Sequence, residues 1–263
     1  MADITAKEVK ALRDATGAGM MDAKGALVET GGDAEAAAQL LREKGLAKAA
    51  KRTDRSNIEG AVALAVEGNR AALVHLKCET DFSAKSDGFV AFVDELVAAV
   101  LAEGPSAMDA REAALDDLRL SVKENIEIGT IEVVEAGEGN LIDTYLHVQD
   151  GRGVNGVIVE GSGVGQEDLH QIALHIAFAK PAALTRDEIS EEAIEKERAA
   201  LLEITKAEGK PEQAWDKIVE GRMTGWFRES VLLDQGLHGD KVTVRDSLGD
   251  GEIVQFNQAY LGG

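Results

Sequence analysis

The sequence has few of the residues that mark disulfide-rich, membrane-spanning or aromatic-cored proteins. Its single cysteine, Cys78, cannot form a disulfide within the chain, which fits a reducing compartment. Aromatic residues make up only 4% of the chain and alanine is abundant, so we expect a helix-rich core of small side chains. No apolar run approaches the ~20 residues of a membrane span, and the first residues lack signal-peptide architecture. We therefore expect a cytoplasmic protein.

Positive charge is also scarce. Lysine and arginine total 28 against 48 aspartate and glutamate residues, so the formal net charge is −20. A surface of this sign repels phosphate backbones, and no basic run offers a local exception. We therefore expect no direct binding of nucleic acid and no binding to anionic membranes. The length of 263 residues suggests one or two domains with a substantial core.

The sequence shows no group of residues typical of an enzyme. On a strand, His75 and Cys78 point to opposite faces, so they cannot share a site. His170 and His175 are about 140° apart on a helix and have no evident third metal ligand. The segment Gly161–Gln166 lacks the third glycine of a dinucleotide-binding turn and follows a hairpin, which favours a plain turn. We predict no enzyme activity, no cofactor and no metal site.

The first fifty or so residues have the pattern of three short helices. Thr5 and Glu8 form a capping box before the first helix, which is expected to end at the glycines of "TGAG". Asp33 is expected to cap the third helix, and Gly45 to end it. Helices this short must pack together to be stable. We predict a three-helix domain and a polar linker over residues 1–54.

The centre of the chain repeats a strand–strand–helix plan, near residues 58–103 and 140–180. Each repeat has a glycine-rich turn between its strands, which predicts an antiparallel hairpin covered by a helix. A helical segment around 107–129 is expected to join the repeats, with "GTIEVVEAG" as a further short strand. The predicted fold class is α+β, with core subdomains at 55–139 and 140–263.

The second subdomain contains a predicted antiparallel helical hairpin at about residues 185–230. Trp215, Val219 and Trp226 fall on one face of its return helix, and "GKP" supplies a tight turn. Because the first arm is mostly charged, we expect the hairpin to project from the body. The remaining sequence indicates one more strand-like run and then a tail.

Three features mix polar and apolar residues at turns. Asp81 and Phe82 lie at the junction between a predicted strand and a predicted helix. By default Asp81 caps the helix and Phe82 packs on it, whereas the alternative directs both at another molecule. Met20 and Met21 either fill the small helical core or make adaptable partner contacts, and one of them must face outward. His147 either completes a sheet or contacts a partner.

Four motifs occur together along the chain: "LRDATGAGMMDAKGAL", "ETDFSAKSDGF", "HIAFAKP" and "EGKPEQAWDKIVEGRM". In this order they closely resemble the bacterial elongation factor Ts family, over essentially the full chain. The resemblance implies a ubiquitin-associated-like three-helix domain, a two-part α+β core and a projecting helical hairpin. It also implies guanine-nucleotide exchange on the GTPase elongation factor Tu during translation elongation.

The resemblance also implies which residues act. Thr80, Asp81, Phe82 and Ser83 match a Thr-Asp-Phe-Val motif whose Asp-Phe pair enters the GTPase beside its magnesium site. Ser83 departs from the valine, which weakens apolar contact there, and Ser86 stands where an asparagine is common. These four residues, Thr80 to Ser83, are called the tip below.

Partner-binding positions implied by the same resemblance are Arg13, Met20, Met21 and His147. We expect the helical hairpin to serve orientation or assembly, including a two-to-two complex. Two rival functions are an enzyme with an unrecognised site and a passive binding module of the ubiquitin-associated type. The tip distinguishes the exchange-factor hypothesis from the passive-module hypothesis, because a passive module has no need of Asp81 and Phe82.

Overall fold

Local sequence signals set the boundaries of the first helices in the computed structural model, which describes residues 4–49, 52 and 55–263. The predicted capping box is present: the Thr5 side chain accepts from the Glu8 N–H, and the Glu8 carboxylate accepts from the Thr5 N–H. Gly17, with a φ of 67°, ends the first helix. The Asp33 carboxylate caps the third helix. The helices are α1 (Ala6–Thr16), α2 (Met20–Glu29) and α3 (Ala34–Ala49).

The predicted end of α3 at Gly45 is wrong, because the helix continues to Ala49. Gly45 instead allows close packing: a Cβ there would lie 2.3 Å from Leu120 Cδ2 of α6 (Glu112–Val122). Beside this contact Arg42 pairs with Asp117. The three helices therefore dock on the core through α3 and α6. Part of the predicted linker, residues 50–51 and 53–54, lies outside the described residues.

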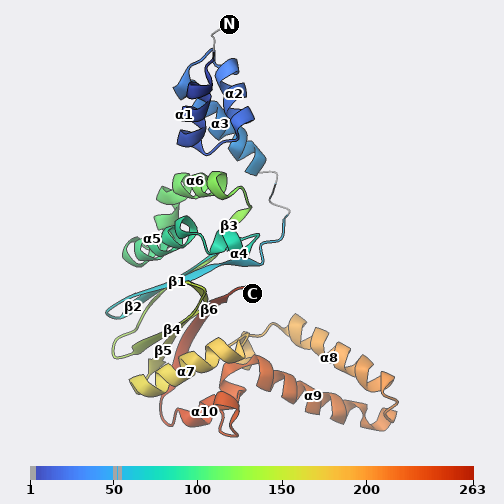
Figure 1. The fold of residues 1–263 in the computed structure, drawn as a ribbon. Coiled ribbons are helices and arrows are strands. Elements are labelled where there is room, and N and C mark those ends of the chain that lie inside the picture. The colour runs from blue at the N-terminus through green and yellow to red at the C-terminus, as the bar shows by residue number, and fades with distance from the viewer. Residues whose placement is uncertain (1–3, 50–51, 53–54) are drawn as a thin grey trace.

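Two three-stranded antiparallel sheets confirm the α+β prediction (Figure 1). The first sheet has the order β1-β2-β3 and the second the order β4-β5-β6. Helix α5 (Asp87–Glu103) covers the first sheet and α7 (Gln166–Ala179) covers the second. The strands are β1 (Glu59–Glu67), β2 (Arg70–Cys78), β3 (Ile126–Glu135), β4 (Leu141–Gln149), β5 (Arg152–Ser162) and β6 (Glu252–Tyr260). The strand–strand–helix plan thus occurs twice, as predicted.

Two boundaries differ from the sequence predictions. The helical segment expected over 107–129 begins as a 3₁₀ helix (Pro105–Arg111), continues as α6 and ends at Lys123, whose φ is 59°. Strand β3 then starts earlier than "GTIEVVEAG" suggested. At the end of the chain a short helix that the sequence did not predict, α10 (Val244–Ser247), precedes β6.

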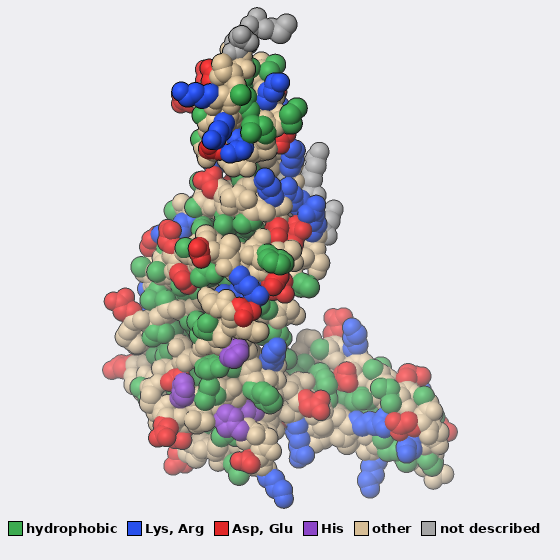
Figure 2. Space-filling view, viewed as in Figure 1, with side chains coloured by type: hydrophobic (Ala, Val, Ile, Leu, Met, Phe, Trp, Pro, Cys, Tyr) green, Lys and Arg blue, Asp and Glu red, His purple; other side chains and the backbone are tan. Residues whose placement is uncertain are grey.

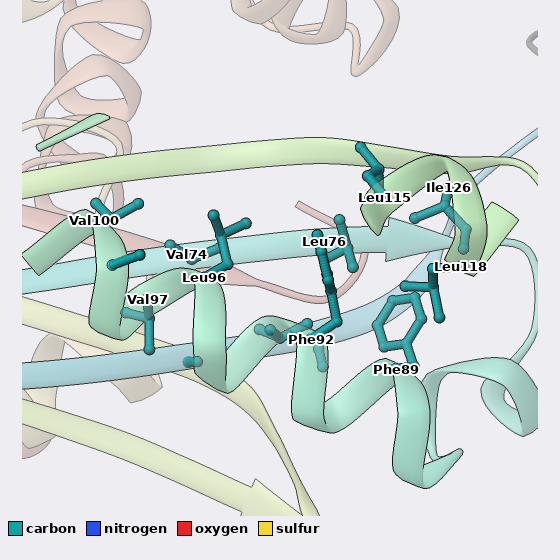
Figure 3. Close-up of a cluster of buried hydrophobic side chains, with 14 of the residues drawn as sticks. Val74, Leu76, Phe89, Phe92, Leu96, Val97, Val100, Leu115, Leu118 and Ile126 are labelled. Carbon is teal, nitrogen blue, oxygen red and sulfur yellow. The ribbon is translucent and has the colours of Figure 1, made fainter. Parts of the chain in front are cut away.

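Alternate side chains of β2 pack into two different hydrophobic clusters. Val74 and Leu76 face α5, where Phe89 lies fully buried among them (Figure 3). Leu73 points the other way and packs with Ile158 of β5 between the two sheets. Strand β2 is therefore buried on both faces, which is consistent with its nearly continuous apolar sequence.

The predicted helical hairpin is formed by α8 (Glu191–Ala207) and α9 (Trp215–Ser230), and it projects from the body (Figure 1). Val219 and Met223 are buried along its seam, opposite Thr205. Trp215 and Trp226 are only half-buried. The indole Nε1–H of Trp215 donates to the Lys210 carbonyl at 2.8 Å, so this ring supports the turn between the arms.

Candidate protein-interaction site

The tip is a separate short helix between β2 and α5. Helix α4 spans Asp81–Ala84, and Thr80 caps it by accepting from the Ser83 N–H at 3.3 Å. Asp81 is the first helical residue, and Phe82 is 85% exposed. The default interpretation, in which Asp81 caps the helix and Phe82 packs on it, is therefore wrong. The chain holds the aromatic ring in solvent.

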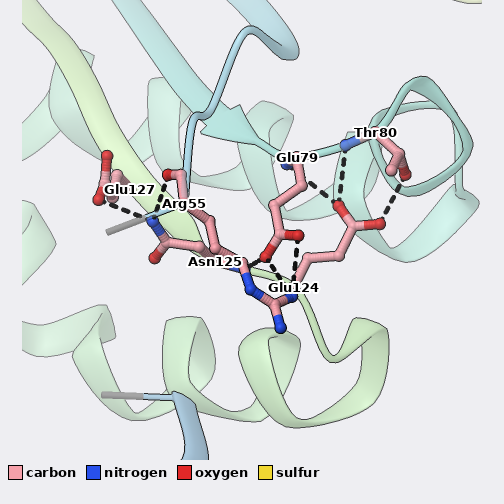
Figure 4. Close-up of polar contacts among 6 residues, drawn as sticks. All are labelled: Arg55, Glu79, Thr80, Glu124, Asn125 and Glu127. Atoms are coloured by element: carbon pink, nitrogen blue, oxygen red, sulfur yellow. Dashed lines mark hydrogen bonds and ion pairs between the residues drawn. The ribbon is translucent and has the colours of Figure 1, made fainter. Parts of the chain in front are cut away.

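Glu124 holds the base of α4 from the start of β3 (Figure 4). One carboxylate oxygen accepts from the backbone N–H groups of Glu79 and Thr80, at 3.1 and 3.0 Å. The other accepts from the Thr80 hydroxyl at 2.6 Å. The hydroxyl thus donates to Glu124 while it caps α4. Hydrogen bonds to a charged acceptor contribute about 1.5–3 kcal/mol each, so the base is well anchored.

A second set of contacts fixes Glu79 (Figure 4). Its side chain accepts from the Asn125 backbone N–H at 2.7 Å and from the Arg55 guanidinium at 3.0 Å. The Asn125 side chain in turn donates to Glu127 at 2.9 Å. These bonds join the residue before the tip to the start of β3 and to the segment that enters β1. The base of the tip therefore rests on two separate stretches of chain.

Lys85 links the tip to the second half of the molecule. Its ammonium lies 2.9 Å from Asp81 and 3.0 Å from Asp150, in the turn between β4 and β5. The hydrogen bond from Lys85 lowers the pKa of Asp81, so this carboxyl is ionised at neutral pH. Its charge is partly balanced by Lys85.

His147 is exposed near the end of β4, close to that same turn. Its Nδ1 lies 3.1 Å from the Tyr145 hydroxyl, and Tyr145 packs on the α7 side of the sheet. Leu146 packs between the sheets, so His147 faces the opposite side of β4. A bulge between His147 and Val148 interrupts the expected alternation, and Val148 is exposed too.

The remaining predicted binding residues lie apart from the tip, on the three N-terminal helices. Met20 and Met21 are 46% and 77% exposed, and neither belongs to the small core. Filling of that core is therefore excluded for both. Arg13 is half-buried and pairs with Asp14. The structure thus presents two separate regions, one around the tip and His147 and one on the first two helices.

The other residues weighed from the sequence have local partners or are buried. His75 and Cys78 are buried on opposite faces of β2, and burial raises the pKa of the Cys78 thiol to about 12. His170 pairs with Asp143 at 2.8 Å, whereas His175 bonds to Gln235. On the face shown in Figure 2, the histidines gather over the second half of the molecule.

The segment Gly161–Gln166 leads from antiparallel β5 into α7, and Gly163 has a φ of 67°. It forms a turn, as the sequence indicated. Across the described residues, no group of three or more metal-binding side chains comes together. None of the helices in that part of the chain is long and apolar enough to cross a membrane.

Sequence reasoning missed the residues that support the tip. Lys85 stands four residues after Asp81, so the helical spacing of opposite charges could have identified this pair. Glu124 and Asp150 are distant in sequence and carry no local signal, because only the docking of β3 and of the β4–β5 turn brings them close.

Comparison with known proteins identifies the family. The family model described as Elongation factor TS matches residues 79–262. Elongation factor Ts of Clavibacter michiganensis subsp. michiganensis is 44% identical, with 89% of each chain covered. That of Cutibacterium acnes is 43% identical over 93% of each chain. That of Mycobacterium ulcerans is 40% identical, covering 100% of this chain and 99% of the relative. The chain belongs to the elongation factor Ts family.

Proposed function

We propose that this protein is a guanine-nucleotide exchange factor for the GTPase elongation factor Tu in translation elongation. Family membership supports the class of function, and the exposure of Phe82 on an anchored tip is the observation that carries it. An aromatic ring left in solvent gains nothing for folding. Its burial in a partner supplies about 1.5–3 kcal/mol of binding free energy.

The tip acts by differential binding rather than by covalent chemistry. Phe82 enters the GTPase near its magnesium site, and the Asp81 carboxylate disturbs the ligands or waters around the ion. Contacts that form only when the nucleotide-side elements have shifted favour the state with weak GDP binding. By linkage, GDP then weakens binding of the factor by the same ratio, and GTP completes the cycle.

The hydrogen bonds at the base of the tip support this mechanism. Phe82 can displace elements of the GTPase only if the tip itself stays in place. Glu124 holds it by accepting from the backbone N–H groups of Glu79 and Thr80. Ser83 contributes its backbone N–H to the Thr80 cap. The smaller side chain that replaces valine there leaves Phe82 as the main apolar contact.

We also propose a division of labour along the chain. Residues 1–54 supply affinity through Arg13, Met20 and Met21, and the core subdomains at 55–139 and 140–263 carry the exchange step. His147 contacts the nucleotide-binding domain of the partner beside the tip. The helical hairpin serves orientation or assembly, including a two-to-two complex.

The proposal is tested by release of fluorescent GDP from elongation factor Tu, measured across a concentration series of this protein. Phe82→Ala and Asp81→Ala should lower the maximal release rate by about 10- to 100-fold, because each removes a contact made in the exchanging state. Val66→Ala is the matched control, since Val66 is 50% exposed and lies beside the turn at the other end of the first sheet.

Unfolding transitions of the same variants separate function from structure. Both tip variants should unfold close to the midpoint of the original protein, because Phe82 is exposed and the half-buried Asp81 loses only a surface ion pair. If both variants unfold at lower denaturant, the loss of release is explained by a less stable fold and not by a missing contact with the GTPase. Unchanged maximal release by both variants would reject the tip mechanism.

A further inference from the structure

One large apolar side chain outside the tip is as exposed as Phe82. Phe178, near the C-terminal end of α7, is 85% exposed. The helix buries Leu169, Ile172 and Ile176 against the second sheet. Phe178 stands nine residues after Leu169, which places it roughly 180° around the helix, directed away from the sheet. Packing of the fold therefore leaves this ring without a role.

The end of α7 that carries Phe178 is firmly held. The Asn155 side chain of β5 donates to the Ala177 carbonyl at 2.8 Å, and both residues are buried. Lys180 ends the helix with a φ of 50°, and its ammonium lies 4.0 Å from the centre of the Tyr260 ring. A partner that binds Phe178 therefore has little backbone entropy to remove, because the helix end is already ordered.

A continuous series of contacts connects this helix end with the tip. Asn155, which bonds to α7, pairs with His147 across β4 and β5. The turn that follows β4 carries Asp150, which pairs with Lys85, and Lys85 pairs with Asp81 of the tip. In Figure 1, α4 and the C-terminal end of α7 lie on the same side of the two sheets, the side from which the hairpin projects.

We propose that Phe178 is a second apolar anchor for the GTPase, bound in a hollow of its surface while the tip acts at the nucleotide site. The proposal rests on the proposed exchange function. Its occupant is the GTPase because Ala177, the neighbour of Phe178, bonds to Asn155, the cross-strand partner of His147, and because the β4–β5 turn that follows His147 contacts the tip through Lys85. A second anchor adds binding free energy away from the nucleotide site and leaves the exchange step to the tip.

The test uses the full chain in the same GDP-release titration. Phe178→Ala should raise the concentration that gives half-maximal release by about 10- to 100-fold, the value of one buried aromatic side chain. The maximal rate should stay within about twofold, because the tip is unchanged. Phe82→Ala should show the opposite split, and Val66→Ala should match the original protein in both quantities.

Three outcomes would overturn the proposal. A titration of Phe178→Ala that superimposes on that of the original protein, while Phe82→Ala still slows release, removes the anchor and leaves the exchange function intact. A lower unfolding midpoint for Phe178→Ala assigns the ring a structural role. A smaller mass of the free protein by light scattering, with unchanged release, shows that Phe178 binds a second copy of this chain. If the original protein fails to accelerate release, the exchange function itself is rejected.

Discussion

The two halves of the core share a plan but differ where the strand meets the helix. In the first half, α4 stands between β2 and α5 and holds Phe82 outward on a base fixed by Glu124. In the second half, a glycine turn joins β5 directly to α7, whose N-terminus has no side-chain cap. The same supersecondary unit thus carries a supported protrusion in one copy and a plain connection in the other.

The halves also differ in how they accommodate a buried histidine. The His75 ring is buried in the first sheet, and its Nε2 has no hydrogen-bond partner there. His175 of α7 bonds at Nε2 to Gln235 and accepts from the His238 N–H at Nδ1. One half therefore tolerates an unsatisfied polar atom, while the other satisfies both ring nitrogens. The burial of His75 therefore costs the first half stability that the hydrogen bonds of His175 spare the second half.

The largest effect is expected where the halves touch. A Cβ on Gly153 of β5 would lie 2.1 Å from the Val62 carbonyl oxygen of β1. Backbone cannot move aside as a side chain can, so Gly153→Ala should lower the free energy of unfolding by roughly 3–5 kcal/mol. Denaturant unfolding measures this change. Gly88→Ala is the control, because nothing lies within 4 Å of its Cβ position in α5, and similar losses in both variants would contradict the explanation.

The next effect concerns His75 and pH. Burial lowers the pKa of His75 from its ordinary value of 6.5 to about 4. Between those values the unfolded chain binds a proton that the folded protein does not bind. Stability is therefore complete above pH 6.5 and declines as the pH falls towards 4, by roughly 3 kcal/mol from this residue.

Denaturant unfolding across pH 4–7 compares the original protein with His75→Leu. The variant should lose this part of the pH dependence, while the part contributed by other groups remains. Parallel stability profiles for the two proteins would show that the imidazole is protonated without cost in the fold.

A smaller effect is expected at the base of the tip. Thr80→Val removes the hydroxyl that caps α4 and donates to Glu124, with little change in shape. Loss of a cap costs about 1 kcal/mol of the free energy of unfolding. Because the tip is then less firmly held, elongation factor Tu saturated with this variant should also release GDP more slowly. Thr80→Ser keeps the hydroxyl and should behave like the original protein in both assays. Equal behaviour of the serine and valine variants would exclude the hydroxyl as the cause.

The smallest effect on exchange is expected from removal of the helical hairpin in the second half. Replacing residues 187–228 with a short Gly-Ser linker removes the hairpin but leaves the tip and His147 in place. The maximal release rate should stay within the same order of magnitude, although affinity or the mass of the complex can fall. Release measured across a concentration series decides this. A collapse of the maximal rate would make the hairpin part of the exchange step.

The sequence predicted features that depend on near neighbours and failed where distant segments meet. The Thr5–Glu8 capping box lies within one turn and was predicted correctly. Gly45 was misassigned because a glycine that ends a helix and one that allows close packing look alike until Leu120 is in place. The support of the tip could not be predicted locally, since Thr80 is bonded by Glu124, 44 residues away in the sequence.

Strand β5 has a consequence for cooperativity. It is the central strand of the second sheet, yet its Ile158 lies in a cluster with Val62 and Leu73 of the first. A cut in the chain between residues 139 and 140 would separate the sheets in sequence but leave each with an uncovered apolar face. Neither fragment should fold alone, and mixing them should restore structure as a split protein does. Heating the intact core should give one calorimetric transition rather than two.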